Sequence, residues 1–274
     1  MISRAMPRTL LSVHGEPERR EDLLAIEEPL EIRVQAPGEA PVQIAVTMRT
    51  PGHDAELAIG FLVTEGLLTR REQLGTPVVR ELTVEGGVSN IATVRVTEPF
   101  DATRLKRNFY ATSSCGVCGK AALEHIHTTA PAIAAGPILG RSVLLGLPGA
   151  LRAAQVTFAQ TGGLHATAAF DAQGTLLLAR EDVGRHNAMD KVIGRLVMDG
   201  GLPFSNGVLL VSGRASFELV QKAAMAAVPI LCAVSAPSSL AVLTAERVGM
   251  TLAGFLREGG FNLYTRAERV DTAG

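Results

Sequence analysis

The sequence predicts an α/β protein in which a small α+β unit precedes a larger domain with a sheet between helices. Two patterns lead to this fold class. Short apolar runs alternate with segments of helical periodicity over the second half of the 274 residues, and such alternation is typical of parallel sheets covered by helices. Residues 29 to about 100 instead show strand-like alternation around a single helix. With 47% apolar residues, the chain can bury a sizeable core.

The N-terminal part is expected to hold an arm followed by the small unit. Polar and charged residues dominate residues 1–28, and we expect a loosely ordered arm there. Residues 29–104 are expected to form the α+β unit. Its strands are predicted, from alternating apolar and polar residues, at 30–34, 42–46 and 90–97. A helix is predicted over 55–68, with Asp54 as its N-cap.

The remainder is expected to hold a loop and the larger domain. Residues 105–127 are expected to form a flexible loop with two cysteines, followed by a helix over 120–127. Residues 128–274 are expected to form the α/β domain. Its strands are predicted at 154–158, 164–170, 175–179, 208–212, 230–234, 251–256 and 261–265. Its helices are predicted at 187–198, 217–227 and 240–248.

The charge and the apolar content exclude several classes of function. A formal net charge of −1 argues against nucleic-acid binding by bulk charge, and 4% aromatic residues without Trp argue against a base-stacking platform. Residues 223–245 carry no charge and could span a membrane, but Pro229 and Pro237 interrupt them, so we expect a soluble core segment. Three cysteines fit a reducing compartment, and we expect a cytoplasmic protein.

Residues 112–120, TSSCGVCGK, place Cys115 and Cys118 in a C-x-x-C pair flanked by glycines. A free thiol has a pKa of about 8.5, and a helix N-terminus or a nearby cation can lower it to about 3.5–7.5. A helix is expected just after Cys118, and Lys120 adds positive charge. The pattern therefore indicates a nucleophilic thiolate that could hold sulfur as a persulfide, while the second thiol assists release or forms a disulfide.

Two other uses of the pair stay open. Zinc could be bound together with His125, His127 and Cys232, although C-x2-C-x6-H-x-H is an unusual spacing and Cys232 lies in a predicted buried strand. A thioredoxin-like dithiol normally follows a strand in a smaller βαβ unit, which this segment does not match. Sulfur transfer is favoured over both, and no metal site is predicted.

Three loops connect predicted strands to predicted helices, at residues 180–187, 212–216 and 235–239. In open α/β sheets, ligands bind at the carboxyl ends of strands, where small residues let the backbone approach phosphate. Arg185 and His186 would add cationic donors to the first loop, which alone could equally be a capped turn. Together the loops predict a nucleotide-sized anionic ligand. His165, which follows two glycines, is interpreted as a further ligand contact.

These stretches together resemble the formate dehydrogenase accessory sulfurtransferase (FdhD) family. The matching segments cover the chain from about residue 28 to its end. They read TPGHDAELAIGF at 50–61, TSSCGVCGK at 112–120, TGGLH at 161–165, EDVGRHNAMDK at 181–191, SGRASFEL at 212–219 and SAPSS at 235–239. Several long matches in the right order are far more specific than a single C-x-x-C pair.

The resemblance implies a sulfur carrier for a molybdenum or tungsten formate dehydrogenase. Such a protein receives sulfur from a cysteine desulfurase and passes it to the metal of the bis(molybdopterin guanine dinucleotide) cofactor. By motif position, Cys115 would bear the persulfide and Cys118 would be its partner. The implied partners are therefore the desulfurase and the catalytic subunit of formate dehydrogenase, and neither a nucleic acid nor a membrane is expected.

The resemblance also implies a cofactor-binding stretch at residues 255–260, FLREGG, and a guanine nucleotide such as GDP is expected to mimic the cofactor. Arginine side chains and backbone N–H groups would hold its phosphates and guanine. The expected binding residues are Phe255, Leu256, Arg257, Glu258, Gly259, Gly260, Arg185, His186, Ser212, Gly213, Arg214 and Ser235.

For the fold, the resemblance implies a three-layer αβα main domain similar to the cytidine deaminase fold, and a homodimer. Zinc deaminases carry P-C-x-x-C, whereas Ser114 precedes Cys115 here, so a shared architecture would not bring deaminase chemistry. Two rival functions stay open: a cofactor chaperone that never carries sulfur, and a zinc-dependent hydrolase of the deaminase type.

Overall fold

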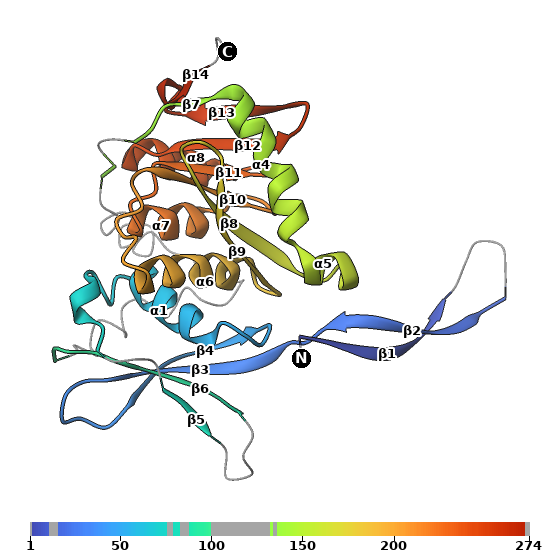
Figure 1. Ribbon diagram of the computed structural model, residues 1–274, viewed down its shortest axis with the longest axis vertical. Helices are drawn as coiled ribbons and strands as arrows, with labels where there is room; N and C mark the ends of the chain where they lie inside the picture. Colours follow the sequence, from blue (N-terminus) through green and yellow to red (C-terminus); the bar gives the residue numbers. More distant parts are fainter. Residues whose placement is uncertain are drawn as a thin grey trace.

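The computed structural model describes residues 2–10, 16–75, 79–82, 88–99, 132–133 and 136–271. In these residues a six-stranded sheet with helices on its faces lies beside a four-stranded sheet with one helix (Figure 1). A two-stranded hairpin extends away from both sheets. The mixed α/β class predicted from the sequence is confirmed for the described residues.

The hairpin consists of β1 (Ser3–Leu10) and β2 (Glu18–Ala25), which pair antiparallel. Its strands carry complementary charges, and Arg8 Nη1 lies 3.4 Å from Asp22 Oδ2 across the pair. The expectation of a loosely ordered arm over residues 1–28 is therefore corrected for these two strands. Low apolar content suggested disorder, but hydrogen bonds between strands use backbone groups and do not require apolar side chains.

The four-stranded sheet has the order β4-β3-β6-β5. Its strands are β3 (Glu28–Gln35), β4 (Val42–Arg49), β5 (Val79–Leu82) and β6 (Val88–Arg95). Strand β3 pairs antiparallel with β4 and parallel with β6. Alternate side chains of β3, namely Leu30, Ile32 and Val34, are buried in the core. The strands predicted at 30–34, 42–46 and 90–97 are thus confirmed.

Helix α1 (Asp54–Thr64) follows β4 and ends before the predicted residue 68. Asp54 was predicted as the N-cap, but it is the first helical residue, and His53 takes the cap position with a positive φ of 57°. The Asp54 carboxylate instead accepts hydrogen bonds from Arg49 Nε and Nη2, at 3.0 and 3.1 Å. A buried ion pair therefore replaces the expected cap.

The large sheet has the order β13-β12-β11-β10-β8-β9. Its strands are β8 (His165–Asp171), β9 (Leu176–Asp182), β10 (Gly207–Val211), β11 (Ile230–Ala233), β12 (Thr251–Arg257) and β13 (Gly260–Thr265). Strands β10, β11 and β12 are parallel, whereas the pairs β8–β9, β8–β10 and β12–β13 are antiparallel. The predicted parallel pairing is therefore correct only at the centre. The short connections between β8 and β9 and between β12 and β13 make these two pairs antiparallel hairpins.

Helices cover both faces of the large sheet (Figure 1). One core cluster joins α4 (Arg141–Ala154) to one face, and the other joins α6 (Arg185–Met198), α7 (Phe217–Met225) and α8 (Ser239–Val248) to the opposite face. Helix α5 (Val156–Thr161) follows α4, so the strand predicted at 154–158 is wrong. Its β-branched and aromatic residues favour a strand in isolation, but here they form a helical turn. Likeness to the cytidine deaminase fold stays a prediction.

The two sheets share one core through the contact of α1 with α6. A side chain carbon added at Gly60 would collide with the backbone oxygen of Asp190, and one added at Gly194 would collide with that of Glu56. The helices therefore touch backbone to backbone, and apolar residues of both belong to one cluster. The domain boundaries expected near residues 104 and 127 lie outside the described residues and stay predictions.

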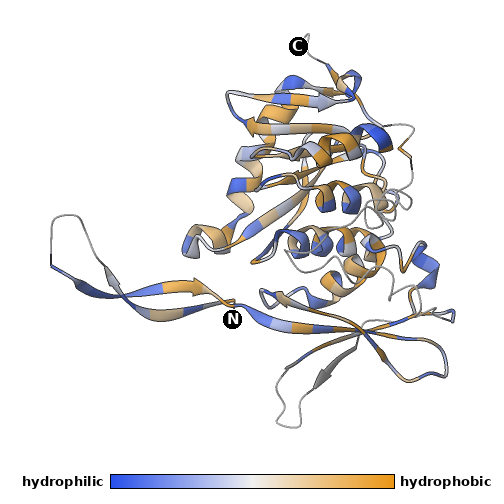
Figure 2. Cartoon of the chain, turned by 180° about the vertical axis from the view of Figure 1, so that it is seen from behind, coloured by the Kyte–Doolittle hydropathy of each residue, from blue (hydrophilic) through white to orange (hydrophobic). Residues whose placement is uncertain are grey.

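Apolar residues concentrate on the strands of the large sheet and on the helices that cover it (Figure 2). The uncharged residues 223–245 are divided between the end of α7, β11 and the start of α8, as expected for a core segment. No helix in the described ranges is long and apolar enough to cross a membrane. Two short parallel strands, β7 (Leu139–Gly140) and β14 (Val270–Asp271), complete the described fold.

Candidate functional site

Two loops follow the parallel strands β10 and β11 and bind each other at the edge of the large sheet. Ser235 N donates to Gly213 O at 3.2 Å, Ala215 N donates to Ala236 O at 3.2 Å, and Ser238 N donates to Ala215 O at 3.0 Å. The Ser238 side chain caps α8 by accepting from Ala241 N. The two strand-to-helix loops recognised in the sequence are therefore fixed against one another.

The same edge receives the start of β8 and the end of β9, because these strands run antiparallel to their neighbours. Ser212 N donates to Ala166 O, and Ala166 N donates to Ser212 Oγ, both at 2.9 Å. His165 lies opposite Asp182 in the β8–β9 pair. At the other end, Phe255 N donates to Ser235 O at 3.1 Å. The predicted binding loops thus meet along one edge.

This edge is long rather than compact. Four strand spacings separate β9 from β12 in the sheet order, and each spacing is about 4.8 Å, which gives roughly 19 Å. Arg185 and His186 begin the helix after β9, whereas residues 255–260 form the end of β12, a turn and the start of β13. A ligand that touched both groups would have to be extended.

The loop after β9 is held from beneath by the buried carboxylate of Asp182. Its Oδ2 lies 2.6 Å from Lys191 Nζ and accepts from Thr50 N, and its Oδ1 accepts from Gly184 N and Asn187 Nδ2. Gly184 occupies the cap position of α6, and no side chain caps this helix. The carboxylate therefore positions the loop that carries Arg185.

His186 was interpreted from the sequence as a cationic donor, but its surroundings in the fold favour the uncharged imidazole. Burial, together with the charges of Arg185 and Lys222, lowers the pKa of His186 to about 4. Its Nε2 atom lies 3.9 Å from Glu218 Oε2. At neutral pH the imidazole is uncharged, so it can exchange hydrogen bonds with a ligand but adds no positive charge to the edge.

The stretch at residues 255–260 presents its side chains unevenly. Leu256 is fully buried in the core on the α4 face, so only its backbone could contact a ligand. Phe255 is 40% exposed and has a positive φ of 54°, a conformation that costs about 1–3 kcal/mol in residues other than glycine. Arg257 and Glu258 are exposed at the turn. The strained, exposed aromatic residue marks this turn as a candidate contact surface.

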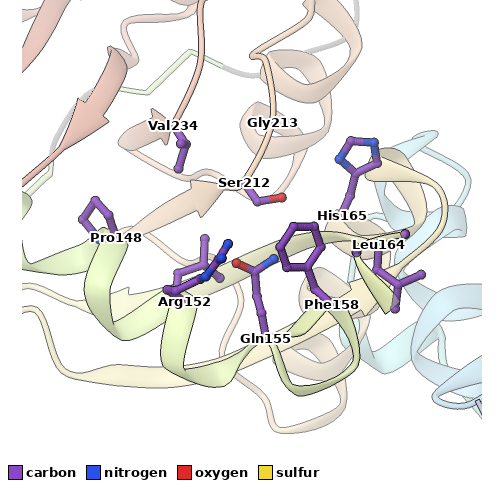
Figure 3. A pocket seen from close by; sticks show the side chains of 12 residues that line it. Pro148, Arg152, Gln155, Phe158, Leu164, His165, Ser212, Gly213 and Val234 are labelled. Carbon is purple, nitrogen blue, oxygen red and sulfur yellow. The ribbon is translucent and has the colours of Figure 1, made fainter. Parts of the chain in front are cut away.

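A cavity of about 420 Å³ opens beside the edge, between the sheet and helices α4 and α5 (Figure 3). It contains three residues singled out from the sequence, His165, Ser212 and Gly213. Burial and the charge of Arg185 lower the pKa of His165. The other lining residues are Pro148, Leu151, Arg152, Gln155, Phe158, Gly162, Gly163, Leu164 and Val234.

Sequence reasoning missed Arg152, Gln155 and Phe158, which line this cavity. Arg152 is in the last turn of α4, Gln155 joins α4 to α5, and Phe158 is in α5. A strand was predicted over 154–158. Leu144, Leu147 and Leu151, spaced i, i+3 and i+7, are the buried face of α4 and were the available signal for a helix. Arg214 and Ser235, both predicted, belong to the loops at the edge but do not line the cavity.

The two cysteines of the C-x-x-C pair, with His125 and His127, lie outside the described residues. The third cysteine, Cys232, is fully buried in β11, and burial raises the pKa of its thiol to about 12. A thiol held in this form is a poor metal ligand. No cluster of three or more ligand-type residues occurs within the described ranges.

The chain is similar to known proteins over nearly its whole length. Residues 25–271 match the model of the FdhD/NarQ family. A protein named sulfur carrier protein FdhD from Mycolicibacterium paratuberculosis is 52% identical over 262 residues, which cover 93% of this chain and 94% of that protein. A protein of the same name from Streptomyces coelicolor is 50% identical, over 93% of this chain and 92% of that protein. Another, from Thermoplasma volcanium, is 42% identical, over 91% of this chain and 90% of that protein.

The fold also matches a solved structure. A crystal structure from Desulfotalea psychrophila, whose protein carries the provisional description of a formate dehydrogenase accessory protein, superposes with a TM-score of 0.74. It covers 99% of this chain and all of that chain at 22% sequence identity, which supports the fold alone. The match of 247 consecutive residues to the family model, with relatives about half identical over more than nine-tenths of the chain, shows that this chain belongs to the FdhD/NarQ family.

Proposed function

We propose that this chain is a sulfur carrier that serves a formate dehydrogenase. The observation that carries the proposal is the similarity, over 93% of the chain, to proteins named sulfur carrier protein FdhD. The presence of Cys115 and Cys118 in this sequence supports it, since the role requires a reactive thiol. The chain would act as a sulfurtransferase in the cytoplasm and, in line with the family resemblance, as a homodimer.

The proposed sulfur-accepting step is a displacement at sulfur. The Cys115 thiolate attacks the outer sulfur of a persulfide on a cysteine desulfurase, and the sulfur–sulfur bond of the donor breaks. The donor cysteine leaves as a thiolate, while Cys115 keeps the transferred sulfur as its own persulfide. No external oxidant or reductant is consumed in this exchange. Cys118 would then assist release of the sulfur, or attack the inner sulfur of the persulfide and close a disulfide with Cys115 while the outer sulfur leaves as hydrosulfide.

The substrate that receives the sulfur would be the bis(molybdopterin guanine dinucleotide) cofactor, held at the edge of the large sheet. The edge spans roughly 19 Å between β9 and β12, which suits an extended ligand rather than a mononucleotide. Arg185, Arg214 and Arg257 would bind its phosphates, and backbone groups of Ser212, Gly213 and Ser235 would approach closely. His186 would contribute hydrogen bonds without charge. GDP is a convenient probe of this site.

Mass spectrometry of the intact protein tests the sulfur-accepting step. The wild type and the variants Cys115→Ala, Cys118→Ala and Cys232→Ala are incubated with a cysteine desulfurase and cysteine. We expect a gain of one sulfur that a reductant removes in the wild type, its loss in Cys115→Ala, and its retention in Cys232→Ala, because Cys232 is buried. An unchanged mass for the wild type with an active desulfurase would favour a cofactor chaperone that never carries sulfur.

A further inference from the structure

The cavity between α4, α5 and the sheet edge has the composition of a site for a small organic molecule. Its volume of about 420 Å³ is larger than a phosphate needs and lies within the range of about 300–1,000 Å³ of small-molecule sites. Pro148, Leu151 and Leu164 give it apolar walls, and neither Asp nor Glu is among the described residues that line it. A flat, partly apolar ligand without positive charge would fit these walls.

Two polar side chains face this cavity without a hydrogen bond or ion pair to the part of the chain that the structure describes. Gln155 is only 5% exposed, and its amide points toward Arg152 and Ser212 (Figure 3). No hydrogen bond of this amide and no ion pair of Arg152 is formed with the described residues. Because this amide is not among the buried polar atoms without a partner, it is open to the cavity, where a ligand that bonds to Gln155 would take the place of water.

Phe158 supplies a flat apolar surface beside these two groups. The Arg152 guanidinium carbon lies 5.0 Å from the centre of the Phe158 ring, which is a cation–π contact. Helix α5, which carries Phe158, is fixed to the sheet because the Glu181 carboxylate accepts hydrogen bonds from Thr157 N and Phe158 N, at 2.9 and 2.7 Å. The backbone that carries the ring is therefore held in place before any ligand binds.

These features together select one class of ligand. An amide side chain offers a donor next to an acceptor, which matches the N–H and C=O or ring-nitrogen atoms on the edge of a purine or a pterin. The phenyl ring matches the flat face of the same heterocycle. Ser212 and Gly213 line the cavity and also belong to the loop after β10, so the cavity is continuous with the arginine-bearing edge.

We propose that this cavity seats a purine or pterin ring at the end of a phosphate-bearing ligand whose remainder lies along the sheet-edge loops. The ring edge bonds to Gln155, its face packs against Phe158, and Arg152 and Ser212 bind polar atoms near the ring. The inference rests on the proposed function, because that function supplies an extended ligand with both kinds of ring. It adds the residues of α4 and α5, which neither the sequence motifs nor the family resemblance indicated.

Isothermal titration of the full-length protein with GMP tests the proposal directly. The variants are Gln155→Leu and Phe158→Leu, and the matched control is Gln160→Leu, an exposed residue of the same helix outside the cavity. We expect each cavity variant to bind GMP at least about tenfold more weakly and the control to bind as the wild type does. Thermal unfolding of each variant verifies that the fold is kept; where Phe158→Leu fails to fold, Gln155→Leu decides.

Further probes separate a ring site from an anion site and a purine from a pterin. Inorganic phosphate, AMP and neopterin are each tested as competitors of GMP. If phosphate displaces GMP as strongly as AMP or neopterin does, the cavity recognises charge alone and the proposal is overturned. Equal GMP affinity in Gln155→Leu, Phe158→Leu and Gln160→Leu would also overturn it. Tighter binding of GMP than of neopterin would assign the cavity to the purine, and the reverse order to the pterin.

A second readout separates failure of this inference from failure of the proposed function. Gln155→Leu is treated with desulfurase and cysteine, and its sulfur gain is measured by mass. We expect the gain to equal that of the wild type, because Gln155 has no part in sulfur acceptance. Normal sulfur gain with unchanged GMP binding would refute the cavity assignment alone. Absent sulfur gain in the wild type, with weakened GMP binding in the variant, would refute the carrier function alone.

Discussion

Replacement of Asp182 by Asn is predicted to destabilise the fold strongly. The carboxylate is fully buried and receives four donors, two on each oxygen: Lys191 and Thr50 N on Oδ2, and Gly184 N and Asn187 Nδ2 on Oδ1. Asparagine has nearly the same shape but replaces one acceptor with an NH2 group. In either orientation of the amide, this NH2 group would face two donors, and Lys191 would lose its counter-charge.

The magnitude follows from these contacts. Removal of one member of a buried ion pair costs about 3–5 kcal/mol, and each buried donor left without an acceptor costs about 1–3 kcal/mol. Relaxation of the loop reduces the sum, so we expect a loss of about 3–5 kcal/mol in the free energy of unfolding. This is a large part of the roughly 5–15 kcal/mol that stabilises a typical domain.

Urea denaturation followed by far-ultraviolet circular dichroism measures this change, since the chain has no Trp for fluorescence. Asp199→Asn is the matched control: its carboxylate is 51% exposed and pairs with Arg195 at 2.7 Å at the other end of α6, which is worth only about 0.3–0.5 kcal/mol. The double variant Asp182→Asn/Lys191→Met should recover part of the loss. Equal stability of Asp182→Asn and Asp199→Asn would refute the reasoning.

Three further predictions concern the core. Gly60→Ala should lower the free energy of unfolding by about 1–3 kcal/mol, because the added methyl group meets the Asp190 backbone oxygen. The control Gly146→Ala has open space around it and should not destabilise α4. Thermal unfolding of the two variants measures the difference. Burial raises the pKa of Asp190 to about 6, against its usual 3.8, despite the neighbouring Lys222, so the folded state binds the proton more tightly. Stability relative to Asp190→Asn should therefore fall as pH rises from about 4 to 6, and a pH-independent difference in urea midpoints would contradict this. Cys232 should resist alkylation at pH 8 until urea unfolds the chain, given a thiol pKa of about 12; modification in the native protein would disprove its burial.

The parts of the fold that follow from local patterns were predicted well. Strand β3 alternates buried and less buried residues, and α6 has the expected apolar face. The strand-to-helix loops after β10 and β11 were placed because glycine and serine follow apolar runs. These features depend on residues close in sequence, which is where periodicity carries information.

The errors arose where tertiary contacts decide the structure. Residues 156–158 look like a strand by composition, but Glu181, distant in sequence, fixes their N–H groups in a helical turn. Asp54 looks like a helix cap, but it pairs with Arg49 instead. The cavity was missed for the same reason, since its walls come from α4, α5, the start of β8 and the loops after β10 and β11, which only the folded chain brings together.

Charge in the folded state was another quantity that the sequence could not provide. His186 next to Arg185 suggests a cationic pair, but burial and neighbouring positive charges lower the pKa of His186 to about 4. Leu256 lies in the expected binding stretch, yet its side chain is completely buried. Both outcomes depend on how deeply a side chain lies in the fold, which a motif does not encode.

The central claim is that sulfur passes through Cys115 to the cofactor of formate dehydrogenase, and a label-transfer experiment tests it most directly. The protein is charged with isotope-labelled sulfur by a desulfurase, freed of donor, and mixed with cofactor-loaded, inactive formate dehydrogenase. Our account predicts that the label leaves Cys115, appears on the cofactor isolated from the enzyme, and accompanies the gain of formate oxidation. Full activation by Cys115→Ala, with no label on the cofactor, would contradict the account.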